Sequence, residues 1–262
     1  MEALGDSISV PEGVRSGAAE AAYAASRNGL LVFAPGASGA AERRSIVWVD
    51  RSGREQSVGV PLHAYFHPRL SGDDARLAVV ARDEDQDMWL WDFKKPALTK
   101  LTSGSARELN PVWLPDNEHL LYASRTKSGV VQVFSVRADG AGAPTQVTSG
   151  SDSLWPISVT PDGLMAVVVS LPPANTQQQL ALVHLAGNGR TESLLTGKSR
   201  IINGEVSPDG QWLAYQSNAT AREEIYVRPF PHVKGATTRI ATGMQPAWCR
   251  TGSELFCLDA DG

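Results

Sequence analysis

A short turn between two apolar stretches recurs six times along this chain of 262 residues. Its clearest copy, Ser-Pro-Asp-Gly at 207–210, comes just before the apolar run Trp212–Tyr215. Proline presets the φ angle at the first corner of a tight turn, while Asp and Gly supply side-chain hydrogen bonding and a positive φ. An apolar run of this length is typical of a strand buried on both faces. Each copy therefore predicts a hairpin of two strands.

The spacing of the turn is nearly constant, at 45, 43, 46, 47 and 42 residues. The fourth residues of the six copies are Gly29, Asp74, Asn117, Gly163, Gly210 and Gly252. A second marker, Thr-Gly or Thr-Ser-Gly, ends at Gly104, Gly150, Gly197 and Gly243, which are 46, 47 and 46 residues apart. A repeat of about 40–50 residues with four strand-like pieces is typical of a β-propeller blade.

The repeats predict an all-β fold, a β-propeller of four-stranded blades. We expect five complete blades and a partial sixth, at residues 21–60, 65–104, 110–150, 155–197, 203–243 and 245–262. Residues 1–20 are expected to supply a linker and, within 3–14, an outer strand that closes the ring. The turn at 259–262 is not followed by a third strand. We therefore expect an incompletely closed ring and a chain that is a piece of a longer protein.

Composition narrows the possible partners. The net charge of −4 leaves no basic stripe of the kind that nucleic-acid-binding proteins carry, so no nucleic acid is expected to bind. No window approaches about 18 consecutive apolar residues, so direct membrane insertion is not expected. The first 17 residues lack the apolar run of a secretory signal. Cys249 and Cys257 lie too far apart in one predicted hairpin to bond, so both are expected to be free and buried.

Motifs that would indicate a metal or a nucleotide fail on their spacing. The acidic run 83–87 would need Gly and Glu where Met88 and Lys94 stand to be a calcium loop, so it is interpreted as a solvated turn. Gly-Lys-Ser at 197–199 lacks the glycine that a phosphate loop needs five residues earlier, and it is interpreted as a connection between blades.

Catalytic patterns are missing as well. His63 and His67 lie in a strand-and-turn pattern without an attached cluster of Cys or acidic residues, so a metal site is not expected there. The Gly-x-Ser-x-Gly element of hydrolases and the kinase elements are absent from the sequence. The sequence therefore predicts no catalytic residue, no cofactor and no metal ligand, and it leaves the binding residues undetermined. The seven tryptophans are expected to pack between neighbouring sheets.

The repeat also carries a family resemblance. The pattern Pro-x-Trp-x-Pro-Asp-Gly followed by Leu-x-Tyr, at Asn110–Tyr122, Ser207–Tyr215 and Gln245–Phe256, resembles the WD40-like PD40 repeats of TolB-type propellers. The run Ile225–Pro231 is similar to the C-terminal propeller of bacterial receptor-type serine/threonine kinases. The first two blades depart from the pattern because their turns lack the proline.

The resemblance implies a sensing or protein-interaction module on the extracytoplasmic side of a bacterium, preceded in its parent protein by a kinase and a membrane helix. The leading hypothesis is thus a non-catalytic propeller that binds a protein or a small ligand on one face. Two alternatives remain open. One is the regulatory propeller of a serine peptidase of the prolyl oligopeptidase or tricorn type, and the other is a free TolB-like periplasmic scaffold.

Overall fold

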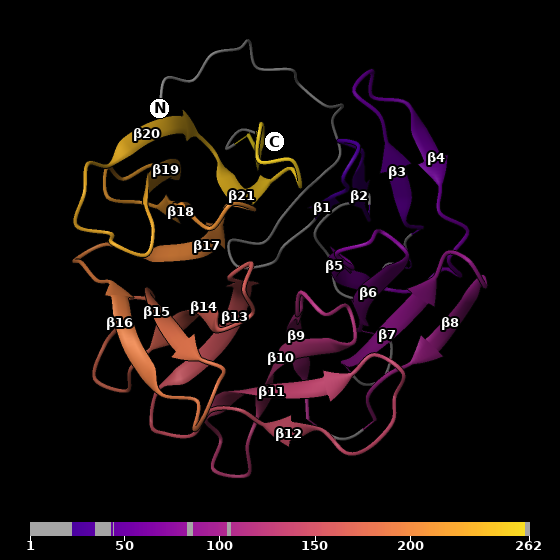
Figure 1. Cartoon of the computed structure of the whole chain (residues 1–262), viewed down its shortest axis with the longest axis horizontal. Coiled ribbons are helices and arrows are strands. Elements are labelled where there is room, and N and C mark those ends of the chain that lie inside the picture. Colours follow the sequence, from indigo (N-terminus) through magenta and orange to yellow (C-terminus); the bar gives the residue numbers. More distant parts are fainter. Residues whose placement is uncertain (1–22, 35–42, 44, 83–85, 104–105, 260–262) are drawn as a thin grey trace.

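Antiparallel strands that follow one another in the chain form every sheet of this protein. The computed structural model describes residues 23–34, 43, 45–82, 86–103 and 106–259. Five four-stranded sheets are arranged around a common centre, with the first strand of each sheet innermost (Figure 1). A meander of four strands repeated radially is the architecture of a β-propeller. The predicted all-β propeller is therefore confirmed for five blades.

The strands of the first three blades have the following bounds. Blade one contains β1 (Tyr23–Ala25), β2 (Leu31–Phe33), β3 (Val47–Val49) and β4 (Glu55–Ser57). Blade two contains β5 (Tyr65–Leu70), β6 (Arg76–Ala81), β7 (Asp87–Asp92) and β8 (Ala97–Lys100). Blade three contains β9 (Glu108–Trp113), β10 (His119–Arg125), β11 (Val131–Arg137) and β12 (Thr145–Gln146).

The remaining strands continue the same order. Blade four contains β13 (Ser153–Val159), β14 (Met165–Leu171), β15 (Gln179–His184) and β16 (Thr191–Leu195). Blade five contains β17 (Ile201–Val206), β18 (Trp212–Ser217), β19 (Glu224–Pro229) and β20 (Thr238–Thr242). The last two strands, β21 (Met244–Trp248) and β22 (Leu255–Leu258), pair with each other in a two-stranded sheet.

The two-stranded sheet lies beside blade one. Its Ala247, Phe256 and Leu258 pack against the apolar side chains of β1, β2 and β3. The Tyr23 hydroxyl donates a hydrogen bond of 2.7 Å to the Gln245 carbonyl oxygen, which ties β1 to β21. The segments 3–14 and 260–262, which bear on the predicted closure of the sixth blade, lie outside the described residues.

The six repeated turns have the backbone geometry that the sequence predicts. Their fourth residues, from Gly29 to Gly252, all have φ between 57° and 77°. In each turn the N–H of this residue donates to the carbonyl oxygen of the first residue, at 2.8–3.3 Å. The Ser207 hydroxyl illustrates the side-chain contribution, because it donates to Asp209 Oδ1 and accepts the Trp212 N–H at 2.9 Å. One hydroxyl therefore joins the turn to the start of the next strand.

The cysteine in the last turn takes the place of this hydroxyl. Cys249 is the first residue of its turn, it is 1% exposed, and its Sγ accepts the Glu254 N–H at 3.2 Å. Both cysteines are free, as predicted. The prediction that both are buried is wrong for Cys257, which is exposed. Cys257 lies on β22, and the strands that cover the corresponding position in a four-stranded blade are missing from the described part of this sheet.

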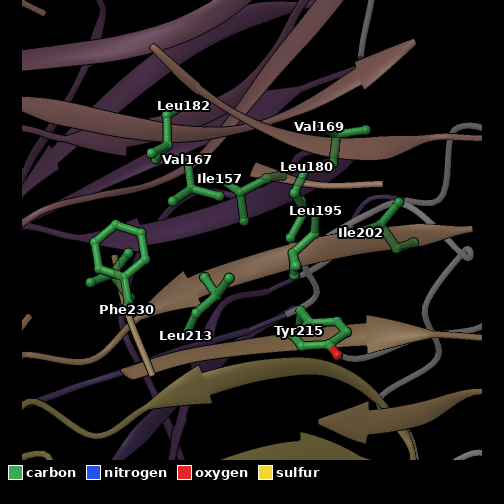
Figure 2. Packing of buried hydrophobic residues seen from close by; sticks show 11 residues of the cluster. Ile157, Val167, Val169, Leu180, Leu182, Leu195, Ile202, Leu213, Tyr215 and Phe230 are labelled. Carbon is green, nitrogen blue, oxygen red and sulfur yellow. The ribbon is translucent and has the colours of Figure 1, made fainter. Parts of the chain in front are cut away.

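Apolar side chains fill the spaces between successive blades. The largest cluster joins blade four to blade five and includes Val167, Leu180, Leu213 and Phe230 (Figure 2). These residues alternate with others that face the opposite neighbour, which explains why the second strand of each blade is apolar on both sides. Among the described residues, no helix is long and apolar enough to cross a membrane.

The left-handed turn residue can be tested at Gly210. An L-residue costs about 1–2 kcal/mol in this region, so Gly210→Ala should lower the free energy of unfolding by about that amount. Gly197→Ala is the matched control, because Gly197 is outside the left-handed region and its added Cβ would meet its nearest neighbour at 3.7 Å. Urea denaturation followed by tryptophan fluorescence measures both variants. Equal losses in the two variants would contradict this account of the turn.

Candidate functional site

A β-bulge recurs in the inner strands, close to the centre of the propeller. Four inner strands carry a residue with left-handed φ four positions before the turn, namely His67, Asn110, Asn203 and Gln245, with φ between 48° and 54°. The strand register shifts at the same place in each. Bulges redirect side chains and are frequent next to functional sites. Non-glycine residues with positive φ are uncommon. Their recurrence at the same position of four inner strands identifies this position as part of a candidate site.

The inner strands run between two ends of the propeller, and different connections gather at each end. Because first and second strands of a blade are antiparallel, the start of the first strand lies beside the end of the second. The repeated turns therefore gather at one end, which we call the turn face. The starts of the inner strands and the loops between second and third strands gather at the other end, which we call the loop face.

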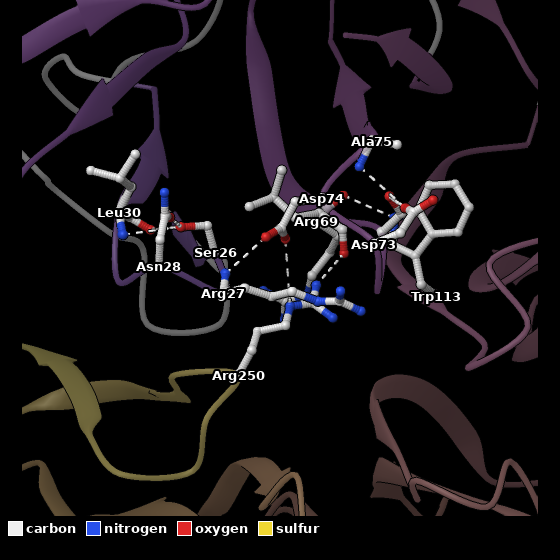
Figure 3. Close-up of polar contacts among 12 residues, drawn as sticks. Ser26, Arg27, Asn28, Leu30, Arg69, Asp73, Asp74, Ala75, Trp113 and Arg250 are labelled. Atoms are coloured by element: carbon white, nitrogen blue, oxygen red, sulfur yellow. Dashed lines mark hydrogen bonds and ion pairs between the residues drawn. The ribbon is translucent and has the colours of Figure 1, made fainter. Parts of the chain in front are cut away.

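Charged side chains link blades at the turn face (Figure 3). Arg69 Nη2 of blade two lies 3.6 Å from Glu205 Oε1 of blade five. Arg250 donates to the Leu70 carbonyl oxygen at 2.7 Å and lies 3.8 Å from Asp74 Oδ1. Arginine can serve several acceptors at once because its guanidinium presents five N–H donors in a plane. The cluster thus ties residues that are far apart in the sequence across the turn face.

Glu205 is the most perturbed group of this cluster. Its side chain is only 20% exposed, and burial raises its pKa to about 7, against the opposing effect of Arg69 and Arg250. Trp248 Nε1 donates to the Glu205 carbonyl oxygen at 3.1 Å, and Trp113 Nε1 donates to the Arg69 carbonyl oxygen at 2.9 Å. These two tryptophans occupy equivalent positions at the ends of β21 and β9 and fix the backbone beside the charged pair.

The loop face contains a cavity of about 340 Å³. Its lining comes from blades two, three, four and five. The polar side chains of the lining are His67, Arg82, Gln86, Arg107, Asn110, Arg125, Gln178 and Asn203. The apolar ones are Leu109, Ala123, Val131, Trp155, Ile157, Val169 and Ile202. A cavity of this size with apolar walls and a few convergent polar groups is the usual form of a small-ligand site.

The described lining of the cavity is positively charged. It holds three arginines and no Asp or Glu, although the whole chain has a net charge of −4. Arg82 is held over the ring of Phe66, with its guanidinium carbon 3.7 Å from the ring centre. Arg125 donates to the Gly129 carbonyl oxygen, and Arg107 is exposed and has no hydrogen bond or ion pair with the described residues. Three acidic residues follow Arg82 in the sequence, at 83–85, and lie outside the described part.

His67 is the most buried polar residue of the cavity, at 2% exposure. Burial, with Arg69 and Arg82 nearby, lowers its pKa to about 3, so the imidazole is neutral at physiological pH. Its Nδ1 accepts the Asn110 N–H at 3.2 Å, which places the ring proton on Nε2. That Nε2 has no hydrogen-bond partner among the described residues. The cavity therefore offers an unused N–H donor.

The other residues that the sequence analysis weighed lie elsewhere. His63 contacts the rings of Tyr65 and Trp89. Asp87 belongs to the acidic run that was interpreted as a solvated turn, and that prediction is wrong for this residue. It begins β7, is 2% exposed and pairs with Lys100 at 2.5 Å, while 83–85 lie outside the described residues. In the part of the chain that the structure describes, no three His, Cys, Asp or Glu side chains gather closely enough to hold a metal ion.

Trp155 is half-buried and packs against the apolar cluster between blades four and five, as predicted, and it also lines the cavity. The cavity residues themselves were missed from the sequence. One signal was present, because His67, Asn110 and Gln245 each stand directly before a proline at the same distance from the turn.

Comparison with known proteins agrees with this geometry. Residues 41–224 match the family model of the PD40 TolB β-propeller domain, which covers more than half of the chain. The chain belongs to the TolB β-propeller family. Within this family match, the likeness to kinase-attached propellers that the sequence suggests is not resolved.

Three proteins illustrate how similar this chain is to known sequences and structures. The uncharacterised protein Atu1656 of Agrobacterium fabrum is 27% identical over 143 residues, which are 51% of this chain and 48% of that protein. TolB from Acinetobacter baumannii superposes with a TM-score of 0.71 at 16% identity, over 88% of this chain and 57% of the other. A TolB candidate from Agrobacterium tumefaciens gives 0.73 at 16% identity, over 90% and 88%. The chain thus spans about half the length of the relative that it matches in sequence.

Some proteins with this fold are enzymes. A puromycin hydrolase superposes with a TM-score of 0.60 at 20% identity, over 88% of this chain but only 41% of the hydrolase. At these identities the similarity shows the fold alone.

The raised pKa of Glu205 makes stability depend on pH. Its folded pKa of about 7 lies above the ordinary 4.5, so proton binding stabilises the folded protein below about pH 4.5, and this contribution is lost as the pH rises to about 7. Between pH 5 and 8 the wild type should therefore lose on the order of 2 kcal/mol more unfolding free energy than Glu205→Gln. Urea titrations at several pH values measure this difference.

Glu254→Gln is the matched control, because Glu254 forms an exposed pair with Arg51 and the substitution should leave the pH profile of the wild type in place. Parallel profiles of the wild type and Glu205→Gln would show that Glu205 does not titrate in this range.

Proposed function

We propose that the chain is a non-catalytic binding module whose binding site is the cavity of the loop face. The single observation that carries this proposal is the meeting of bulge residues from three blades with apolar side chains in one cavity of about 340 Å³. Among the described residues that meet there, no nucleophile and base are arranged for catalysis. The ligand is a small molecule or a short segment of a partner protein, since the cavity admits little more.

We further propose that the module is the sensor of a larger signalling protein. The resemblance of Ile225–Pro231 to kinase-attached propellers supports this role. In that arrangement the kinase and a membrane helix lie in the parent protein, the propeller is extracytoplasmic, and neither nucleic acid nor the membrane itself binds the propeller.

A second candidate function has one specific observation in its favour. The similarity to a puromycin hydrolase is confined to 41% of that enzyme, which is what a regulatory propeller attached to a peptidase domain would give. The flanking reading frame of the gene separates the two candidates, because it would encode a kinase in one case and a hydrolase in the other.

The proposed binding site can be tested by blocking the cavity. A library of small molecules and short peptides is screened by thermal unfolding against the wild type and two variants. Gln178→Trp places a large side chain in the lining, whereas Gln177→Trp adds the same side chain one residue away from it. Ligands that raise the unfolding temperature of the wild type should do so for Gln177→Trp but not for Gln178→Trp.

The proposal fails if no compound stabilises the wild type, or if the compounds that do so act equally on Gln178→Trp. In the second case the ligand site lies elsewhere on the propeller.

We also propose that residues 1–20 form a linker and a strand that closes the ring, with residues 21–262 as the propeller. The two-stranded sheet of β21 and β22 supports this division, because a partial blade leaves an edge at which a strand can pair. Alternate residues of a strand face opposite sides, so Ile8→Lys should promote dimers or aggregates while Ser9→Lys should not. Size-exclusion chromatography with light scattering distinguishes them, and identical behaviour of the two variants would contradict the closing strand.

A further inference from the structure

The cavity of the loop face has a chemistry that selects its ligand. We propose that it binds a small organic anion, a carboxylate joined to an apolar group. This inference rests on the proposed function as a binding module, and it adds the class of ligand.

Charge is the first reason. Arg82, Arg107 and Arg125 come from blades two and three and line the cavity together, while its described lining holds no acidic side chain. Arginine stays protonated at every physiological pH, and its planar fork matches a carboxylate in two parallel hydrogen bonds. Arg107 makes no hydrogen bond or ion pair with the described residues, so its guanidinium is available to a carboxylate in the cavity. A cationic ligand would be repelled by the same arginines.

Unused hydrogen-bond donors are the second and independent reason. The buried Nε2 of His67 has no partner among the described residues, and a buried donor without a partner costs free energy. Asn110 is 7% exposed, and its side-chain amide also makes no hydrogen bond with the described chain. Both residues line the cavity from adjacent bulges. A ligand oxygen within reach of these groups would satisfy them.

A wall of apolar side chains is the reason for proposing that the ligand also carries an apolar group. Trp155, Ile157, Val169 and Ile202 come from blades four and five and carry no charge. An inorganic anion would leave this wall in contact with water, whereas an organic acid with a ring or an alkyl chain would cover it. The cavity therefore combines arginines from blades two and three with an apolar surface on blades four and five.

Isothermal titration calorimetry on the 262-residue chain tests the proposal with four carboxylates, namely benzoate, phenylacetate, indole-3-acetate and hexanoate. The neutral amide of each acid serves as the matched ligand, and inorganic phosphate serves as the anion without an apolar part. At least one carboxylate should bind, and its amide and phosphate should bind at least about tenfold more weakly, because hydrogen bonds to a charged group are stronger than those to a neutral group and phosphate covers no apolar surface.

Arg107→Gln is the informative variant, because Arg107 is exposed and makes no bond that the fold needs. Binding of the carboxylate should weaken by about tenfold. Arg222→Gln is the matched control. Arg222 is an exposed arginine in the loop between β18 and β19, which also belongs to the loop face, and it does not line the cavity. This control variant should bind as the wild type does.

Three results would overturn the proposal. They are no binding by any of the four carboxylates, equal binding of an acid and its amide, and equal loss of affinity in Arg107→Gln and Arg222→Gln. Failure here is distinguishable from failure of the proposed function. If neutral or cationic compounds bind and lose their effect in Gln178→Trp, the cavity is a ligand site but not an anion site.

Discussion

The rest of the structure depends on one local constraint, the left-handed residue in the turn between the first and second strands of each blade. That residue has φ near 60–75° in all six turns, and a hydrogen bond from its N–H closes the turn. In most copies a hydroxyl at the first position also binds the third residue and the next strand. Once the turn is set, the register of the first two strands is set too, and each inner strand points at the centre. The core between blades then follows from alternation along the second strand.

Because every blade repeats the same order of strands, the turn face and the loop face of the propeller carry different connections. The turn face collects short, rigid connections, and its arginines find carboxylates and carbonyl oxygens from other blades. The loop face collects the bulges and the longer connections, and its arginines line a cavity instead. Short connections of this kind stabilise a scaffold, whereas longer surface loops are where binding residues are most often found in proteins.

Much of this fold could be predicted from the sequence because its signals are local. Gly210 and Asn117 favour positive φ through their own chemistry, and a fixed spacing identifies the repeat. The candidate site could not be predicted in the same way. His67 and Asn203 are 136 residues apart and meet only because the blades are arranged in a ring. The burial of Asp87 depends on Lys100 of the next strand, and the exposure of Cys257 depends on its described sheet having two strands, so neither is encoded in the residue's own neighbourhood.

The pair of Arg69 and Glu205 has a further consequence for how the molecule comes apart. In most repeat proteins each unit contacts only its neighbours, so one end can fray while the other remains folded. Blades two and five are not neighbours, yet these two side chains join them across the turn face. If either blade opened alone, it would leave a charged group near the centre without its partner, which is costly in a poorly hydrated environment. The pair thus adds a link between the inner strands of blades two and five to the packing between adjacent blades, and this link opposes the opening of either blade alone.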